Sequence, residues 1–147
     1  MIISIHMRNF IITAILFEIT PLAALAQHHH PEEKSPLSFM AVRSELLSDP
    51  GLAGYKMESS VMTILPGAVD TVAHRHDSEL FGYVLEGAVI VGLDKKEGQV
   101  YRAGEMFYEK RNILHTLTKN PDRKKETKVL LLFIIKEGRA GYTKEYN

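Results

Sequence analysis

Short apolar runs separated by turn residues occupy most of the chain from Phe39 onward. The runs are rich in Val, Ile, Tyr and Phe, and they end near Gly, Pro, Asn or Asp, which is typical of antiparallel strands joined by tight turns. They cover residues 61–65, 81–85, 88–93, 100–101, 106–108, 113–117 and 129–135. This pattern predicts an all-β protein, either a sandwich or a barrel.

Two segments differ from the alternating pattern. Residues 42–47 have the character of a short helix. Residues 129–135 are apolar throughout, which predicts a strand that is buried on both faces.

Composition excludes several classes of function. Lys plus Arg and Asp plus Glu number 18 each, so the formal net charge is zero and we expect no nucleic-acid partner. The chain has no cysteine, which excludes disulfides and thiolate catalysis. Hydrophobic residues make up 45% of the chain, enough for a packed core.

The N-terminal region predicts export. Arg8 precedes a largely apolar stretch, 10–26, which ends in Ala24-Leu25-Ala26 as signal-peptidase sites do. Glu18 and Pro21 interrupt the stretch and argue against a permanent membrane helix. We therefore expect a signal peptide over 1–26, a periplasmic or secreted mature protein, and no stable membrane insertion after cleavage.

A polar leader follows the predicted cleavage point. Residues 27–37 contain His28-His29-His30 and two prolines but no apolar periodicity, so they predict a flexible leader before a barrel over 38–147. The triple His is open to two interpretations, loose metal loading or a solvated tail, and the solvated tail is favoured.

Three histidines inside the predicted barrel carry the candidate chemistry. His74 and His76 lie one residue apart on a run that reads as extended, so strand alternation places both imidazoles on the same side. His115 is in phase with Ile113 and Leu117 and is expected to face the apolar interior, where an imidazole needs a partner. Each feature alone has a structural explanation, but together they offer three nitrogen ligands for one ion.

The surroundings of these histidines resemble the cupin superfamily, specifically its small single-domain members. The first cupin motif is matched by Pro66-Gly67, His74-Arg75-His76, Glu79 and the strand that ends at Gly87. The second is matched by the segment from Gly104 to Tyr108, a turn at Lys110-Arg111-Asn112, then His115 and Asn120. The resemblance implies a double-stranded β-helix, or jelly-roll barrel, with one divalent metal on His74, His76 and His115.

The chain departs from the family pattern in two places. The usual acidic ligand position is Leu80, and Glu79 falls one residue early, so Glu79 is a tentative fourth ligand only if a bulge near Asp77-Ser78 turns it inward. Glu109 or water are the alternatives. The turn 110–112 lacks the family's Pro-x-Gly, but Asn112 tolerates the left-handed conformation that Gly would supply.

The resemblance leaves several functions open. The ligand set suits Fe, Mn, Ni, Zn or Cu, and three His in an open barrel are similar to dioxygenase cupins that act on small molecules. A non-catalytic periplasmic protein that binds a small molecule or metal is the alternative. So is a metal-independent sugar isomerase or epimerase, for which Tyr83 and Tyr108 are candidate partners of a His. The apolar strand 129–135 also offers a surface for a homodimer.

Overall fold

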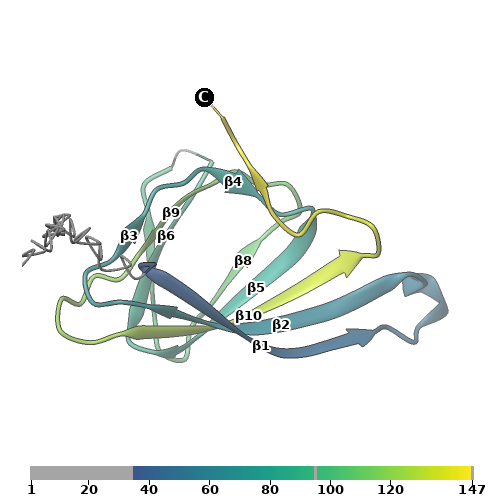
Figure 1. The fold of residues 1–147 in the computed structure, drawn as a ribbon, viewed down its shortest axis with the longest axis horizontal. Coiled ribbons are helices and arrows are strands. Elements are labelled where there is room, and N and C mark those ends of the chain that lie inside the picture. Colours follow the sequence, from purple (N-terminus) through teal and green to yellow (C-terminus); the bar gives the residue numbers. More distant parts are fainter. Residues whose placement is uncertain (1–34, 95, 147) are drawn as a thin grey trace, which may run out of the picture. The chain divides into compact units, whose positions relative to one another are not determined.

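A computed structural model describes residues 35–94 and 96–146. These residues form one compact unit, while the predicted signal peptide and most of the predicted leader lie outside them. Two antiparallel sheets face each other to form a barrel (Figure 1). The strands are β1 (Leu37–Leu46), β2 (Tyr55–Ile64), β3 (Val69–Asp70), β4 (His74–Arg75), β5 (Ser78–Glu86), β6 (Ala88–Leu93), β7 (Gln99–Arg102), β8 (Met106–Glu109), β9 (His115–Lys119), β10 (Thr127–Lys136) and β11 (Thr143–Lys144). One short 3-10 turn, Pro50–Leu52, connects β1 to β2. The described part is therefore all-β, as the alternating pattern predicts.

The first sheet has the order β1-β2-β10-β5-β8 and the second the order β11-β4-β9-β6-β7, with β3 also paired to β9. The long central strand β10 pairs with both β2 and β5. The histidine-bearing strands β4 and β9 are neighbours in the second sheet, and His74 lies directly opposite His115. The topology thus brings together histidines that are far apart in the sequence.

Alternate residues of the strands point into the barrel and build a single core. Strand β5 shows the alternation: Leu80, Gly82 and Val84 are buried, whereas Tyr83 is exposed. The buried hydrophobic residues that pack together in this core are Met62, Ile64, Leu80, Val84, Val89, Val91, Phe107, Val129 and Leu131. Residues from both sheets contribute, so the core fixes the register of each strand against its neighbours.

The structure corrects two expectations. Residues 42–46 belong to β1 and are not helical, because β1 pairs along its length with β2 and this pairing overrides the local helical tendency. In β10, Val129, Leu131 and Ile135 are buried, but Leu130, Leu132 and Ile134 are only half-buried. That strand is therefore covered on one face only.

Two turn residues adopt the conformations that the sequence predicts. Gly87 has φ of 77°, and a Cβ there would meet the Thr127 side chain. Asn112 has φ of 60°, so it does supply the left-handed residue in the turn before β9. In residues 35–94 and 96–146, no helix has the length and apolarity needed to cross a membrane.

Candidate metal centre and ligand pocket

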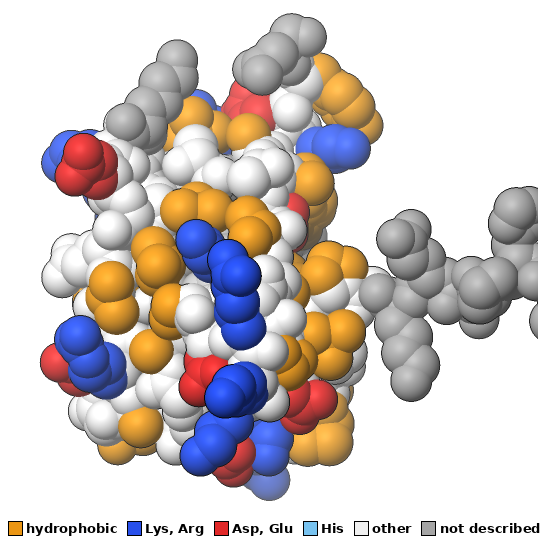
Figure 2. Space-filling view, turned by 90° about the vertical axis from the view of Figure 1, so that its left-hand side faces the viewer, with side chains coloured by type: hydrophobic (Ala, Val, Ile, Leu, Met, Phe, Trp, Pro, Cys, Tyr) orange, Lys and Arg blue, Asp and Glu red, His pale blue; other side chains and the backbone are white. Residues whose placement is uncertain are grey.

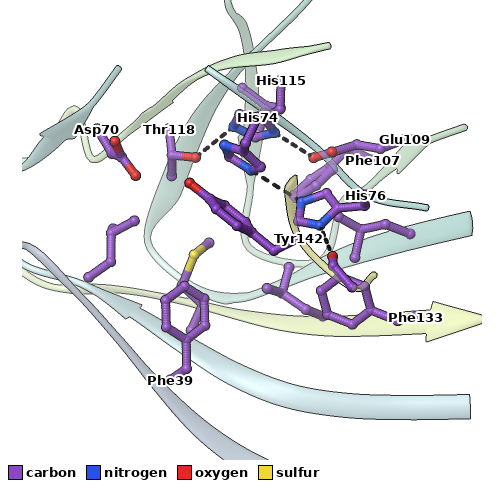
Figure 3. A pocket seen from close by; sticks show the side chains of 16 residues that line it. Phe39, Asp70, His74, His76, Phe107, Glu109, His115, Thr118, Phe133 and Tyr142 are labelled. Atoms are coloured by element: carbon purple, nitrogen blue, oxygen red, sulfur yellow. Dashed lines mark hydrogen bonds and ion pairs between the residues drawn. The ribbon is translucent and has the colours of Figure 1, made fainter. Parts of the chain in front are cut away.

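The three predicted histidine ligands lie together inside the barrel (Figure 3). His74 and His115 are 8% and 6% exposed, and their rings stack with centroids 4.7 Å apart. The Nε2 atoms of His74 and His76 are 3.2 Å apart, so strand alternation has placed both imidazoles on the same side. No histidine side chain is visible on the face of the barrel that Figure 2 shows, where charged and apolar side chains are interspersed.

Hydrogen bonds at Nδ1 fix the tautomer of the first two rings. The Nδ1 of His74 lies 2.8 Å from the Val72 carbonyl oxygen, and that of His76 lies 2.7 Å from the Gly141 carbonyl oxygen. A carbonyl oxygen can only accept, so each Nδ1 carries the proton and each neutral ring has a lone pair at Nε2. Two lone pairs that face each other at 3.2 Å repel unless a proton or a metal ion lies between them.

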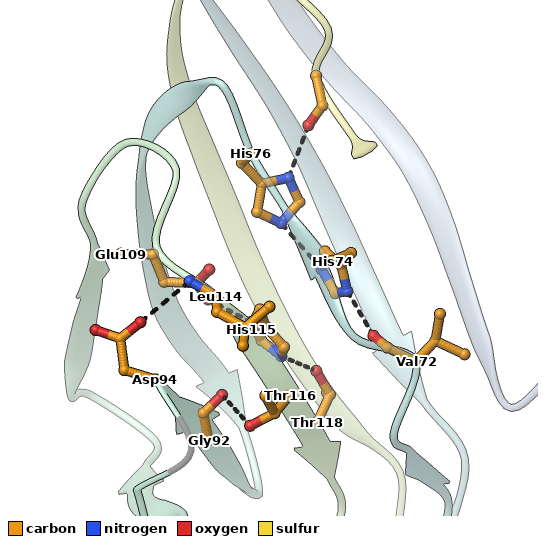
Figure 4. A network of polar contacts seen from close by, with 11 residues as sticks. Val72, His74, His76, Gly92, Asp94, Glu109, Leu114, His115, Thr116 and Thr118 are labelled. Carbon is orange, nitrogen blue, oxygen red and sulfur yellow. Dashed lines mark hydrogen bonds and ion pairs between the residues drawn. The ribbon is translucent and has the colours of Figure 1, made fainter. Parts of the chain in front are cut away.

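His115 has the same tautomer for a different reason (Figure 4). Its Nδ1 donates to the Glu109 carboxylate at 3.0 Å, and its Nε2 accepts from the Thr118 hydroxyl at 2.8 Å. A carboxylate that holds the Nδ1 proton of an imidazole is a common second partner of metal-binding histidines. With the proton at Nδ1, each ring can offer its Nε2 to a metal, and at His115 the Thr118 hydroxyl would have to give up that nitrogen.

Glu109 is the buried carboxylate of this cluster. It is 1% exposed, and its Oε2 has no hydrogen-bond partner among the described residues. A buried carboxylate oxygen without a partner is costly, and a cation or a water would relieve it. Glu109 was one of the alternatives to Glu79, and its strand phase could have favoured it, because it shares a face of β8 with the inward Phe107.

Glu79 does not lie with the histidines. The pairing of β5 with β10 runs without a shift through Ser78 and Glu79, so the bulge that would turn Glu79 inward is absent there. Its carboxylate instead accepts from the Tyr108 hydroxyl on the outer face of the sheet, and this hydrogen bond raises the pKa of Tyr108. Tyr108 and Tyr83 thus lie outside the pocket.

The described side chains, as they stand, contain no group of three or more His, Asp or Glu arranged around one metal position. The rings stack and pair with one another instead of pointing three nitrogens at a common point. Burial lowers the pKa of His74, which favours its neutral, ligating form. The donor set and the unpaired Glu109 oxygen fit a divalent ion, and binding by all three rings requires side-chain rotation within the pocket.

The C-terminal segment completes the cluster, which the sequence did not predict. Tyr142 stacks on the His74 ring with centroids 4.6 Å apart, and Gly141 supplies the carbonyl that orients His76. The segment is held by β11, which pairs with β4, and by an ion pair between Arg75 and Glu145. Nothing in the local sequence pattern marks these residues, since they contact histidines about 65 positions earlier.

The cluster lines one end of a cavity of about 230 Å³. Aliphatic and aromatic side chains form most of its wall, with Thr118 and the titratable groups at the histidine end. The residues around it are Leu37, Phe39, Met62, Asp70, His74, His76, Leu80, Val91, Phe107, Glu109, His115, Thr118, Leu131, Phe133, Gly141 and Tyr142. Such a cavity, apolar with a few converging polar groups, is typical of small-molecule sites.

Comparison with known families gives one match. The family model described as "Cupin domain" matches residues 60–135, a segment that includes all three histidines and Glu109. No curated protein matches the chain.

Three solved structures illustrate the shared fold. An oxalate oxidase in complex with the substrate analogue glycolate is 21% identical, with a TM-score of 0.56 over 76% of this chain and 56% of that one. KdgF from Halomonas sp. is 18% identical, with a TM-score of 0.54 over 70% of this chain and 82% of that one. The DMSP lyase DddQ from Ruegeria pomeroyi DSS-3 is 16% identical, with a TM-score of 0.51 over 59% and 42%. The chain thus spans less than two thirds of the DMSP lyase and the oxalate oxidase, and identities this low show the shared fold alone.

Proposed function

Because this chain belongs to the cupin domain family, we propose that it binds one divalent transition metal on His74, His76 and His115 beside a small-molecule pocket. The observation that carries the proposal is the shared tautomer of the three rings. Each Nδ1 donates to an oxygen, which leaves three unprotonated Nε2 atoms in one cavity. Neutral imidazoles with at most one carboxylate suit Fe, Mn, Ni, Zn or Cu.

We assign Glu109, and not Glu79, as the carboxylate of this site. In its present position Glu109 holds the Nδ1 proton of His115, and its free Oε2 lies buried. It can serve the ion through His115 or contribute an oxygen ligand itself. Both roles give Glu109 a larger effect on metal retention than Glu79, which is engaged with Tyr108.

We further propose that the protein is an enzyme, a metal-dependent dioxygenase. The bound ion would supply Lewis acidity and, for a redox-active metal, electron transfer. The protein would hold the substrate between the ion and the apolar wall, exclude water, and accept a proton at Glu109 Oε2. The unpaired Oε2 is the group of this site that could act as a base, which a non-catalytic binding protein would not need.

The metal-independent isomerase reading has less support. It requires a tyrosine hydroxyl near a histidine inside the pocket, and Tyr83 and Tyr108 lie on the outer face. Tyr142 does stack on His74, but no hydrogen bond joins its hydroxyl to an imidazole in the described set.

The experiment is elemental analysis of the protein purified without an affinity tag. We expect about one Fe, Mn, Ni, Zn or Cu per chain, as a single-ion cupin site requires. Replacement of His28, His29 and His30 by Gln removes adventitious binding by the leader and should leave this content unchanged. His115→Ala should lose the ion. Equal metal content in His115→Ala and in the parent would contradict the site.

A matched pair of glutamates separates the two carboxylate assignments. Glu109→Gln should lose metal to a chelator about tenfold or more faster than the parent, the size of effect expected for partners of a metal-binding His. Glu79→Gln makes the same chemical change on the outer face and should release metal at the parental rate. The opposite order would return Glu79 to the site.

We also propose that two chains associate through the outer face of the first sheet. A row of apolar residues crosses all five strands in register, and its outermost members, Met40 and Met106, are 64% and 51% exposed. The row is Met40, Val61, Leu130, Tyr83 and Met106. A second copy of the chain can cover this row with its own apolar row in a two-fold arrangement. Because the net charge is zero, the two copies would not repel each other through their overall charge.

Export is proposed from the sequence alone. The apolar stretch 10–26 and the small residues before Gln27 support cleavage and a periplasmic or secreted mature protein. N-terminal sequencing of the mature chain from an exporting host tests this, with Gln27 as the expected first residue.

A further inference from the structure

The charges around the pocket limit what it can bind. We propose that the cavity selects small, uncharged, largely apolar molecules, about the size of one substituted six-membered ring, and rejects carboxylate ligands. This inference rests on the proposed function only in placing the ligand beside the ion, because the lining residues carry the argument with or without metal.

The lining contains no Lys or Arg. Its formal charges are the carboxylates of Asp70 and Glu109, both of which face the cavity (Figure 3). The nearby cations point elsewhere: Arg75 pairs with Glu145, and Arg111 pairs with Asp77. A carboxylate ligand would therefore enter a site with two like charges and no Lys or Arg to pair with it, and a buried anion without such a partner is disfavoured.

A bound divalent ion does not reverse this balance. The two carboxylates cancel its charge, and the three imidazoles are neutral in the tautomer that ligates. The metal-loaded pocket is then electrically neutral as a whole. A neutral ligand loses little hydration free energy when it enters the pocket. An anion loses much more, and a pocket without net positive charge does not compensate for that loss.

The remaining wall indicates an apolar, planar occupant. Phe39, Phe133 and Tyr142 supply aromatic surface around the cavity. Aliphatic side chains of Leu37, Met62, Leu80, Val91 and Leu131 complete it. The cavity volume is about 230 Å³. A dry protein cavity of about 150 Å³ is enough to bind benzene, so one ring with a small substituent fits here.

Benzamide and benzoate test the charge selectivity, because the two are nearly the same size and shape and differ in charge. Each is titrated into the metal-free full chain and into the Zn²⁺-loaded full chain by isothermal calorimetry, with amide chemical shifts to locate binding. We expect benzamide to bind at the residues of the cavity in both forms, about tenfold or more tighter than benzoate. Benzoate binding as tight as benzamide in either form, or no benzamide binding in the cavity, would overturn the inference.

One isosteric variant tests whether the Asp70 carboxylate causes the selectivity against benzoate. Asp70→Asn removes a carboxylate charge but keeps an oxygen for the Val72 backbone N–H, so it should strengthen benzoate binding about threefold or more and leave benzamide unchanged. Asp94→Asn is the control, since Asp94 is exposed, lies outside this cavity and likewise accepts a backbone N–H. Equal effects of the two variants would refute the role of Asp70. Failure of the protein to bind Zn²⁺ would count against the proposed metal site. The titrations of the metal-free protein would still test the proposed selectivity of the cavity.

Discussion

Gly82 is the position where the structure predicts the largest effect of adding one methyl group. It lies in the middle of β5, opposite Phe107 of β8, and the Phe107 ring covers its Cα. A Cβ at position 82 would lie within 2.5 Å of ring atoms of Phe107, closer than real Cβ contacts allow. Phe107 is 3% exposed and packs against Tyr101, so its ring can move only toward the cavity that it lines, and that movement gives up packing contacts.

The expected destabilisation follows from two opposing effects. Forcing an extra carbon into a packed core costs about 1–3 kcal/mol, and partial exposure of the displaced ring adds up to about 1.5 kcal/mol when about half of its burial is lost. Replacing Gly by Ala also restricts the unfolded chain, which stabilises the protein by about 0.4–1 kcal/mol. We therefore expect Gly82→Ala to lower the free energy of unfolding by about 2–3 kcal/mol.

The measurement is urea unfolding followed by circular dichroism, since the chain has no tryptophan. Gly141→Ala is the control, because the nearest atom to a Cβ there is 4.0 Å away, and it should show only the stabilisation of about 0.4–1 kcal/mol that comes from the unfolded chain. Combining Gly82→Ala with Phe107→Leu shortens the clashing side chain and should cost at least about 1 kcal/mol less than the sum of the single variants. Additive effects, or a Gly82→Ala variant as stable as the parent, would refute the packing argument.

Three further outcomes are expected elsewhere in the barrel. Asn120 is fully buried, and its amide donates to carbonyls at the end of β2 and in the loop before β10. Asn120→Ala should therefore cost about 3 kcal/mol in urea unfolding. A loss below about 1 kcal/mol would show that water replaces the amide. Glu145→Gln removes the ion pair with Arg75 and should speed chelator extraction of the metal severalfold. Glu137→Gln should not, because Glu137 is exposed after β10 and forms no ion pair with another described residue. Equal rates would mean that the C-terminal segment does not control access to the metal. Leu130→Lys should convert the proposed dimer to a monomer in sedimentation velocity. Val69→Lys adds the same charge on the other sheet and should leave the dimer intact. A monomeric parent protein would refute the dimer proposal.

Features set by local alternation could be predicted from the sequence. The face of β5 that carries Leu80 and Val84, and the common side of His74 and His76, follow from the two-residue period of a strand. The left-handed Asn112 follows from its intrinsic tolerance of positive φ. Each of these depends on a residue and its immediate neighbours.

Features that depend on distant partners could not be predicted. The strand conformation of residues 42–46 comes from pairing with β2, and the position of Gly141 beside His76 comes from a turn that returns the chain to the barrel. Strand phase places Glu109 on the inward face with Phe107, but its contact with His115 depends on β9, a separate strand of the other sheet. Local periodicity carries no information about which distant segment will supply a hydrogen-bond partner.

Arg75, the residue between His74 and His76, has a structural role although it is not a proposed metal ligand. Arg75 points away from His74 and His76 because of the same alternation that brings those two together. Its guanidinium binds the Asn112 carbonyl at 2.6 Å and pairs with Glu145, so it ties both the turn before His115 and the C-terminal segment to the histidine strand. A Lys could hold only one of these partners well, since it lacks the planar fork of Arg. The outward side chain of the motif thus joins the strand of His74 to the turn before His115 and to the C-terminal segment, whose Gly141 carbonyl accepts from the His76 ring.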